Sequence, residues 1–378
     1  MNLLFQFQSK SPEWKEEISM PDWTKSMQQT YDFYEVDPHT WTNKSQIKTI
    51  TGASIEWDLE SSTLTSASFD ATENFGEIYI RTYLTTVQNG ITEHFPLGTH
   101  LVQTPSVEFN GKYNSISYDA YSPLTELIEK SPVIGYYIPK DEQVSEYTYN
   151  IIKNETRLKI DKQKILSVTK GKLTQPFVAN NDDTWMTYIT DLLKSANLRL
   201  NIDSLGDITI VPIISEPTTA SVWTYTDDNS SILTPEITMD NDMYGLPNVV
   251  DLWYNGIHVV SENHRSASPL SIENRGRKII HRLVNPTIIP TDESQEGSIS
   301  YSTLKNYADN LLKQLSSIEC TISYTHGYCP VKVGDTITMN YKRAGITNVK
   351  ALVKTQSITC STGCQVSETA AFQKSLWG

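Results

Sequence analysis

The sequence predicts a mainly β protein in which two β-barrel domains flank a small α+β domain. Strand-like alternation of apolar and polar residues fills both ends of the chain, and helical spacing occurs in the middle and before the last strands. One short pattern also occurs twice, at residues 95–102 and 330–337: an apolar step, a Gly and a polar residue, then alternating strand residues. The match is short and gapped, so it fits either a repeated β-unit or the general chemistry of strands. If the β-unit is repeated, we expect Gly98 and Gly334 to lie in matching turns of the two units.

The order of elements divides the chain into four regions. Residues 1–35 are aromatic, polar and poorly periodic, which predicts an extended arm that packs on a neighbouring subunit or on its own domain. We expect residues 36–128 to form the first β-barrel domain and residues 129–235 the α+β insert. Residues 236–378 then form the second β-barrel domain.

Strands in the first β-domain are indicated by clean alternation, for example at residues 55–59 and 66–71. An Asn-Gly pair at residues 89–90 predicts a two-residue hairpin, because both residue types tolerate a positive φ angle. A Ser-Pro pair at residues 122–123 predicts a short helix that closes the domain, with Ser as N-cap and Pro in the first helical position.

The insert and the last region each combine strands with one clear helix. Residues 181–183 cap the first helix, and strands follow at residues 197–202 and 208–213. In the last region an Asn-Gly pair at residues 255–256 predicts a second hairpin, and Ser302 caps a second helix before the final strands. The apolar faces of the two helices consist of Trp185, Ile189, Leu192, Leu193 and Ala196, and of Leu304, Tyr307, Ala308, Leu311, Leu312, Leu315 and Ile318.

The charge of the chain argues against one class of function. The 378 residues carry a formal net charge of -13 and contain no long run of Lys or Arg. Because a protein that holds nucleic acid by its phosphates needs a basic face, we expect no stable DNA or RNA binding. The same charge suits a surface that DNA passes without being bound. A local excess of positive charge between Arg265 and Arg282 fits either contact with an acidic partner or a solvated loop.

Neither secretion nor membrane insertion is indicated. The first eight residues lack the basic region and the long apolar stretch of a signal peptide. No apolar run approaches the roughly 18 residues that a membrane span requires. We therefore expect a soluble protein made in the cytoplasm.

No catalytic, cofactor-binding or metal-binding residues are predicted. The sequence contains no Gly-x-Ser-x-Gly elbow, no His-Glu-x-x-His helix and no phosphate-binding glycine loop. His94 and His100 are six residues apart on a predicted strand and share a face, where we expect surface side chains rather than metal ligands. The sequence does not fix the distance between any two acidic side chains, so it identifies no carboxylate pair of the glycosidase type. The 20 Tyr and 8 Trp are explained more simply by core packing than by a sugar-binding platform.

The four cysteines lie close to the C-terminus, at Cys320, Cys329, Cys360 and Cys364. Their spacings, C-x8-C and C-x3-C, are not those of a standard zinc knuckle, although two such pairs could form a zinc site. We expect four small buried hydrophobic side chains in a reducing compartment, without a metal.

With this order of β-unit, insert and β-unit, the chain resembles the phage tail hub family. That family includes the baseplate hub proteins of Mu-type and T-even-type phages and the N-terminal hub modules of tail-associated proteins in non-contractile phages. The order of the segments, rather than a single signature, carries the resemblance over most of the chain. The segments are residues 51–59 with 66–69, 95–99, the capped helix before 207–210, 248–251, 333–335 and 367–372.

The resemblance implies a structural virion protein of the tail or baseplate, assembled in the host cytoplasm, with no enzymatic activity and no cofactor. Such hubs form homotrimers in which two tail-tube-like β-barrel domains per subunit produce a pseudo-sixfold ring. One face receives the tail tube or a distal tail protein and the other receives the spike or tail-tip protein. DNA passes through the lumen, and a tape measure protein is a further partner. Residues of about 40–125 and 240–378 would supply the ring modules, with the insert outside or below.

Two rival classes of function have only composition in their favour. A carbohydrate- or receptor-binding tail protein would recognise host cell-wall glycans with exposed Trp and Tyr side chains. A cell-wall hydrolase would need two carboxylates in a cleft.

Overall fold

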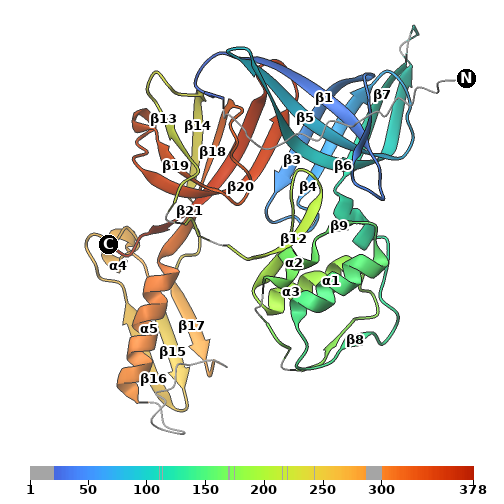
Figure 1. The fold of residues 1–378 in the computed structure, drawn as a ribbon. Coiled ribbons are helices and arrows are strands. Elements are labelled where there is room, and N and C mark those ends of the chain that lie inside the picture. The colour runs from blue at the N-terminus through green and yellow to red at the C-terminus, as the bar shows by residue number, and fades with distance from the viewer. Residues whose placement is uncertain are drawn as a thin grey trace, which may run out of the picture.

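The computed structural model describes residues 21–286 and 300–378, apart from residues 110, 113, 169, 170, 174, 215, 219 and 242. These residues form a large region of β-sheet, an α+β insert below it, and a small unit in which one long helix covers three strands (Figure 1). Among the described residues, no helix combines the length and the apolar character needed to cross a lipid bilayer. Residues 1–20 of the predicted arm lie outside the described residues.

A first β-unit contains seven strands between residues 28 and 121. Buried and exposed side chains alternate along several of them, so that one side of each strand enters the core. The strands are β1 (Gln28–Val36), β2 (Asn43–Gln46), β3 (Ile50–Asp58), β4 (Thr65–Ala71), β5 (Ile78–Gln88), β6 (Ile91–Phe109) and β7 (Asn114–Tyr121).

A second β-unit contains six strands that come from both sides of an intervening segment. The short 3-10 helix η2 (Lys342–Ala344) lies between two of them. The strands are β13 (Trp223–Thr226), β14 (Leu233–Asn241), β18 (Ser317–Gly327), β19 (Thr336–Asn340), β20 (Val349–Thr359) and β21 (Gln365–Ser375).

The two β-units repeat one order of strands. Neighbours in the first unit follow the order β3-β4-β7-β6-β5-β1, and neighbours in the second follow β14-β18-β21-β20-β19-β13. When these strands of each unit are numbered in chain order, the two units have the same order of neighbours in the sheet. One difference is that β1 pairs with β5 antiparallel, whereas β13 pairs with β19 in parallel. The repeated topology favours a duplicated β-unit over a chance likeness of strands.

Sequence similarity between the units is clearest at a β-bulge. Residues 101–104 of β6 read Leu-Val-Gln-Thr, and residues 352–355 of β20 read Leu-Val-Lys-Thr. In both strands the register shifts by one residue directly after the Val, and an Ala lies opposite that Val. The extra residue therefore turns the following side chains to the other face of the sheet at the same point in both units.

The proposed equivalence of Gly98 and Gly334 is wrong. Gly98 lies inside β6, opposite Thr82, whereas Gly334 lies two residues before β19 with a φ of 91°. The counterpart of Gly334 is Gly76, which lies two residues before β5 with a φ of 69°. The short pattern matched two different strands, because similar residues recur wherever a turn meets a strand.

The predicted mainly β fold with an α+β insert is confirmed, whereas two separate β-barrel domains on either side of the insert are not. β20 pairs antiparallel with β3, which joins both units in one 13-stranded sheet, and no closed barrel is found among the described residues. A single apolar core continues across this junction and includes Ile55 and Phe69 of the first unit with Val353 and Ile358 of the second. The first part of β20 pairs with β19 and its end pairs with β3, the edge strand of the first unit, so both units belong to one sheet.

Residues 21–36 pack on the two β-units of their own chain. Trp23 is buried, and its ring lies edge-on to Phe95 and Tyr328 at centroid distances of 5.0 and 5.2 Å. The hydroxyl of Tyr31 donates a hydrogen bond to the carbonyl of Ser361 at 2.7 Å. The arm was predicted to pack either on a neighbouring subunit or on its own domain, and its described part packs on its own domain.

The α+β insert follows the first β-unit, and its sheet has the order β11-β12-β9. α3 begins after Thr184, whose side chain accepts a hydrogen bond from the backbone of Thr187, one residue later than the predicted cap. The predicted apolar face of this helix is buried, with Ala196 as its C-cap. The elements are η1 (Pro123–Leu127), β8 (Tyr137–Ile138), α1 (Val144–Glu155), β9 (Lys159–Ile160), α2 (Lys162–Leu166), β10 (Phe177–Val178), α3 (Trp185–Ser195), β11 (Leu198–Ile202) and β12 (Asp207–Pro212).

A small unit lies between β14 and β18 in the chain, inside the range expected for the second β-domain. Its three strands pair with one another in the order β16-β15-β17 and not with the large sheet. The predicted Asn255-Gly256 hairpin is confirmed, with φ angles of 48° and 81°. α5 begins after Ser300, two residues before the predicted cap, and Ile318 belongs to the next strand. The elements are β15 (Val249–Tyr254), β16 (Ile257–Glu262), α4 (Ile272–Arg275), β17 (Ile280–Val284) and α5 (Tyr301–Leu315).

Candidate functional site

One side of the large sheet carries a polar surface that crosses both β-units. It extends over seven antiparallel strands in the order β14-β18-β21-β20-β3-β4-β7. Residues that lie opposite one another in the register share a face, so rows of side chains can be followed from strand to strand. We call the following residues the polar face: Thr238, Ser323, Thr369, Thr355 and Asp58 in one row, Thr325, Ser367, Ser357, Glu56 and Ser66 in a second, and Ser54, Ser68 and Asp119 in a third.

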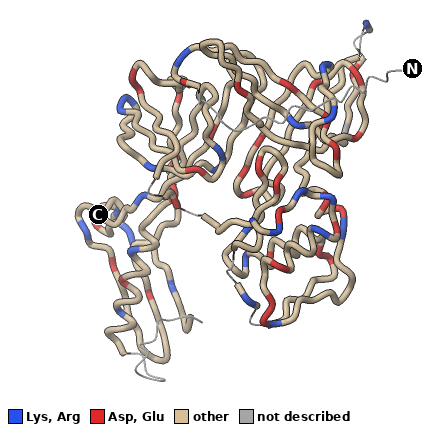
Figure 2. Tube along the Cα trace, viewed as in Figure 1, with Lys and Arg blue, Asp and Glu red and all other residues tan. Residues whose placement is uncertain are grey.

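The polar face is rich in hydroxyl groups and acidic. All of its residues are Ser, Thr, Asp or Glu, and a shallow groove of about 490 Å³ lies over the part nearest β14. Neighbouring hydroxyls bind each other across the strands, as in Ser323–Thr369 at 3.1 Å and Ser54–Ser68 at 2.9 Å. Lys354 beside this face is paired with Glu60 at 3.0 Å, and Lys and Arg are frequent in the insert instead (Figure 2). The sheet therefore presents negative charge and neutral hydroxyls on this side.

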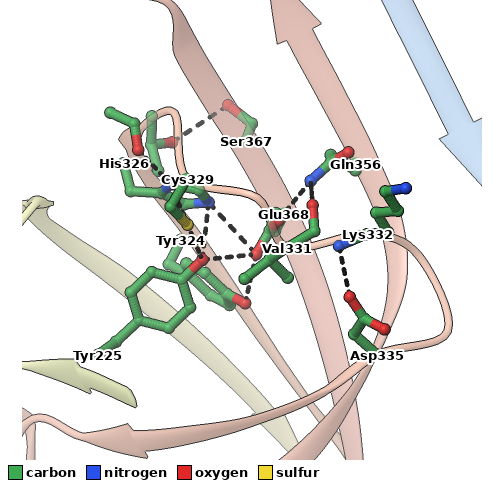
Figure 3. A network of polar contacts seen from close by, with 12 residues as sticks. Tyr225, Tyr324, His326, Cys329, Val331, Lys332, Asp335, Gln356, Ser367 and Glu368 are labelled. Atoms are coloured by element: carbon green, nitrogen blue, oxygen red, sulfur yellow. Dashed lines mark hydrogen bonds and ion pairs between the residues drawn. The ribbon is translucent and has the colours of Figure 1, made fainter. Parts of the chain in front are cut away.

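Beneath the polar face, Glu368 is surrounded by four polar side chains (Figure 3). Its Oε2 atom accepts hydrogen bonds from Tyr324 at 2.7 Å and Tyr225 at 3.2 Å, and it lies 3.3 Å from Nε2 of His326. Its Oε1 atom accepts a hydrogen bond from Gln356 at 2.7 Å. All five residues are buried, and they come from β13, β18, β20 and β21. This network ties the two layers of the second β-unit together.

Glu368 and His326 form a buried ion pair. Nδ1 of His326 lies 2.7 Å from the carbonyl of Gly327 and Nε2 faces the carboxylate, so both ring nitrogens are placed to donate. Burial opposes the charge on His326, but hydrogen bonds with Cys329 and Glu368 and the carboxylate charge outweigh it and raise the pKa of His326 to about 10. Burial also opposes the charge on Glu368, yet the hydrogen bond and charge of His326 lower the pKa of this carboxyl. Both groups are therefore charged at neutral pH.

The network has the character of a structural anchor rather than a catalytic centre. Both carboxylate oxygens of Glu368 already accept hydrogen bonds, and His326 is held between Glu368 and a backbone carbonyl. A general base needs a free lone pair within reach of a substrate, and neither group offers one here. The arrangement instead satisfies every charge that it buries, which is the condition under which a buried ion pair is tolerated.

Two edges of the sheet that bears the polar face have no neighbouring strand within the described chain. β14 pairs only with β18, and β6 pairs only with β7 after residue 102. Val107 and Phe109 of β6 and Met239 of β14 lie on the side opposite the polar face, yet they are 56%, 66% and 42% exposed. Exposed apolar side chains beside an unpaired edge favour pairing with another chain. We call these two segments the free edges.

The prediction for the two histidines is wrong for His100. The register of β5 and β6 shifts between Pro96 and Gly98, so a β-bulge at Leu97 turns the later side chains to the other face. His100 is therefore buried, 2.9 Å from the hydroxyl of Thr65, and burial lowers its pKa to about 3. The ring of His100 also explains why residue 98 is a glycine, because a Cβ atom there would lie 2.5 Å from Cε1 of His100.

The four cysteines form no disulfide in the structure. Cys320, Cys329 and Cys364 are buried and Cys360 is partly buried, all as free thiols. Among the described residues, no three His, Cys, Asp or Glu side chains are placed to hold a metal ion. The structure brings none of these residues into a shared site with the histidines of β6.

The basic stretch between Arg265 and Arg282 binds mainly within its own unit. Arg275 donates to the carbonyl of Leu246 at 2.7 Å, and Arg282 pairs with Asp251 at 2.9 Å. The guanidinium of Arg265 lies over the ring of Trp377. These charges therefore bind within the small unit, rather than only to a partner or to solvent as the sequence predicts.

The sequence analysis missed the polar face and the network of Glu368. A signal for the first was present, because the outward positions of β4 read Ser66, Ser68 and Asp70 between buried apolar residues. No comparable signal marks Glu368, since its partners lie on strands far apart in the chain and a lone Glu in a strand normally faces solvent.

Comparison with solved structures finds phage tail proteins of the same fold. The 43 kDa tail protein of prophage MuSo2 from Shewanella oneidensis matches with a TM-score of 0.58 and 11% identity over 91% of this chain and 98% of that chain. The tail protein from Neisseria meningitidis MC58 matches with a TM-score of 0.56 and 10% identity over 91% and 96% of the two chains. A chain of the Francisella PdpA–VgrG complex matches with a TM-score of 0.53 and 10% identity over 93% of this chain and 58% of that chain.

No protein-family model matches the sequence, and no curated protein does. The likeness is thus one of fold, carried at low sequence identity by nearly the whole chain. The predicted resemblance to phage tail hub proteins is confirmed at that level: this chain has the fold of phage tail proteins.

Proposed function

We propose that this chain is a structural phage tail protein of the hub type, which forms a trimeric ring around a channel for DNA. The observation that carries the proposal is the polar face, a continuous acidic and hydroxyl-rich surface on seven strands of one sheet. Such a surface suits the wall of a channel through which a polyanion moves, because it offers the phosphates no positive charge to bind.

The free edges provide the means of closing a ring. All pairings from β14 to β6 are antiparallel, so β14 of one copy and the end of β6 of the next run in opposite directions. Pairing them would extend the sheet from copy to copy and cover Val107, Phe109 and Met239. Because the two edges differ, the contact is head-to-tail, and such a contact gives a closed ring when the rotation between copies is a whole fraction of a turn, as the proposed trimer requires.

The duplicated β-unit accounts for the symmetry of the proposed ring. Each unit contributes four strands to the wall, β3-β4-β7-β6 in one case and β14-β18-β21-β20 in the other. Three copies therefore present six similar modules, which would match a sixfold tail tube on one face and a threefold spike or tail tip on the other. We assign the ring modules to the two β-units and place the insert and the small unit outside the wall.

The rival functions receive less support from the geometry. Of the described tryptophans, only Trp253 is more than a third exposed, and its ring is already stacked on His258 at a centroid distance of 4.0 Å. A sugar-binding platform needs an uncovered aromatic face. We therefore propose neither a glycan-binding function nor a hydrolase.

Light scattering coupled to size exclusion tests the proposal over a range of protein concentrations. We expect a species with three times the chain mass of 42.7 kDa, at least at high concentration or with a tail tube protein present. A monomer under all of these conditions, or a dimer related by a twofold axis, would contradict the proposed ring.

A further inference from the structure

A cavity of about 180 Å³ lies where the two β-units meet the insert. It lies between the end of β3, the bulge of β6, the turn before β19 and β11, an edge strand of the insert sheet. Apolar side chains make up much of its wall, among them Trp57, Leu97, Val331 and Ile358. An engineered apolar cavity of roughly 150 Å³ is large enough to hold benzene, so this one has room for a small organic molecule.

Arg199 of β11 also lines the cavity. Its neighbours Leu198 and Leu200 are buried in the core of the insert, so strand alternation directs Arg199 to the opposite side. A Cβ built on Gly334 would lie 3.8 Å from Nη2 of Arg199, which places the guanidinium against the turn before β19. The charge therefore lies at the junction of the insert and the second β-unit.

One nitrogen of the partly buried Arg199 guanidinium lacks a hydrogen-bond partner. Its Nη1 atom is out of contact with solvent and has no hydrogen-bond partner among the described residues. Burial lowers the pKa of Arg199, and no acidic side chain contributes to that shift. The nearby Arg81 differs in that its buried guanidinium has acceptors: it donates to the carbonyl of Leu205 at 2.8 Å and to that of Trp41 at 3.2 Å. A buried donor without an acceptor indicates that a group from outside completes the site.

The other charged residues of the wall restrict the charge of that group. Asp58 accepts a hydrogen bond from the backbone of Glu60, and Asp203 accepts two from Leu205 and Asp207; neither acid forms an ion pair with Arg199 among the described residues. Lys332, also on the wall, is exposed. With two acids and two bases around the cavity, a monoanion fits better than a doubly charged phosphate, which both acids would repel.

We infer that the cavity is a binding site for a carboxylate attached to a small apolar body, with Arg199 as its recognition residue. A planar carboxylate matches the fork of a guanidinium, and the apolar wall covers the rest of the ligand. The source is either a free organic acid or a carboxylate of a neighbouring polypeptide. In both cases the bound group would link the insert to the second β-unit. This inference does not rest on the proposed ring, because the cavity lies within one chain.

Isothermal titration calorimetry with sodium benzoate tests the site, and benzamide of the same shape serves as the neutral probe. We expect saturable binding of benzoate, weaker binding of benzamide, and a loss of affinity of about tenfold or more in Arg199→Met. Arg277→Met is the matched control, since it removes an exposed Arg away from the cavity and should bind benzoate like the wild type. Without ligand, Arg199→Met should unfold at the same or a higher temperature than the wild type, because it removes a partly buried charge that has no ion-pair partner.

A dilution series separates the two sources of the carboxylate. If a neighbouring copy supplies it, benzoate binds dilute protein and is excluded as copies associate at higher concentration. If the natural ligand is a free acid, the affinity stays constant. Equal binding of benzoate by Arg199→Met and wild type, or equal binding of benzamide and benzoate, would overturn the inference, because the carboxylate would not be recognised by Arg199. No saturable binding at all would also overturn it and leave a cavity that holds only water.

Discussion

The hydroxyl of Tyr324 lies 2.7 Å from the carboxylate of Glu368 on the neighbouring strand, and both side chains are almost completely buried. Three further polar groups, from Tyr225, His326 and Gln356, surround the same carboxylate. A complete set of partners for a buried acid beneath the polar face indicates that the sheet there must keep one fixed shape. The first two predictions concern this network.

Replacing Glu368 by Gln should lower the free energy of unfolding by about 3 kcal/mol or more, because it leaves His326 buried without its counter-charge. Urea denaturation followed by tryptophan fluorescence measures the change. Glu56→Gln on the polar face is the control, with an expected change within about 0.5 kcal/mol. Similar small effects for both variants would show that the ion pair does not stabilise the second β-unit.

The ion pair also predicts how stability depends on pH. Because folding raises the pKa of His326 to about 10, its contribution is complete below the unfolded value of 6.5 and is lost as the pH rises through 10. Folding lowers the pKa of Glu368, whose contribution is present above about 4.5 and lost in acid. Wild type should therefore lose about 1.4 kcal/mol per pH unit from this pair between pH 7 and 9. His326→Gln should lack that loss, and parallel pH profiles of the two proteins would refute the assignment.

His100 predicts the opposite dependence. Burial lowers its pKa to about 3, so the folded protein keeps the imidazole neutral while the unfolded chain binds a proton below about 6.5. Its contribution to stability is present above pH 6.5 and is lost as the pH falls toward 3. His100→Gln should shift the midpoint of acid unfolding to lower pH, measured by circular dichroism. An unchanged midpoint would mean that other groups control acid unfolding.

The free edges predict which surface substitutions prevent assembly. Phe109→Lys or Met239→Lys should abolish the trimer, because each places a charge on an edge that must be covered when copies pair. Ile134→Lys is the matched control, since Ile134 is 88% exposed on the insert and lies away from both edges. Light scattering measures the mass, and circular dichroism confirms folding. A trimer that survives both edge substitutions would place the subunit contact elsewhere.

Local features of the fold followed from the sequence where short-range chemistry determines them. The Asn-Gly pairs at residues 89–90 and 255–256 both adopt positive φ angles in hairpins, and Ser122 accepts a hydrogen bond at the start of η1. The helix caps lie one and two residues from the predicted positions, because neighbouring Asn, Asp, Ser and Thr residues compete for the same role.

Long-range features could not be derived in the same way. The alternation that identifies β20 and β3 as strands does not say that they pair, yet this pairing joins the two β-units in one sheet. The bulge at Leu97 inverts the face of His100, and a single inserted residue has no reliable sequence signal. The same reasoning applies to Arg199, whose position in a cavity depends on three segments that meet only in the folded chain.

Single-particle electron microscopy of the assembled protein tests the central claim most directly, because it shows where each side of the sheet faces. The account predicts three copies around a channel lined by the polar face, with β14 of each copy beside the end of β6 of the next. A ring in which Glu56, Asp58 and Asp119 face outward, or in which the free edges remain uncovered, would contradict it.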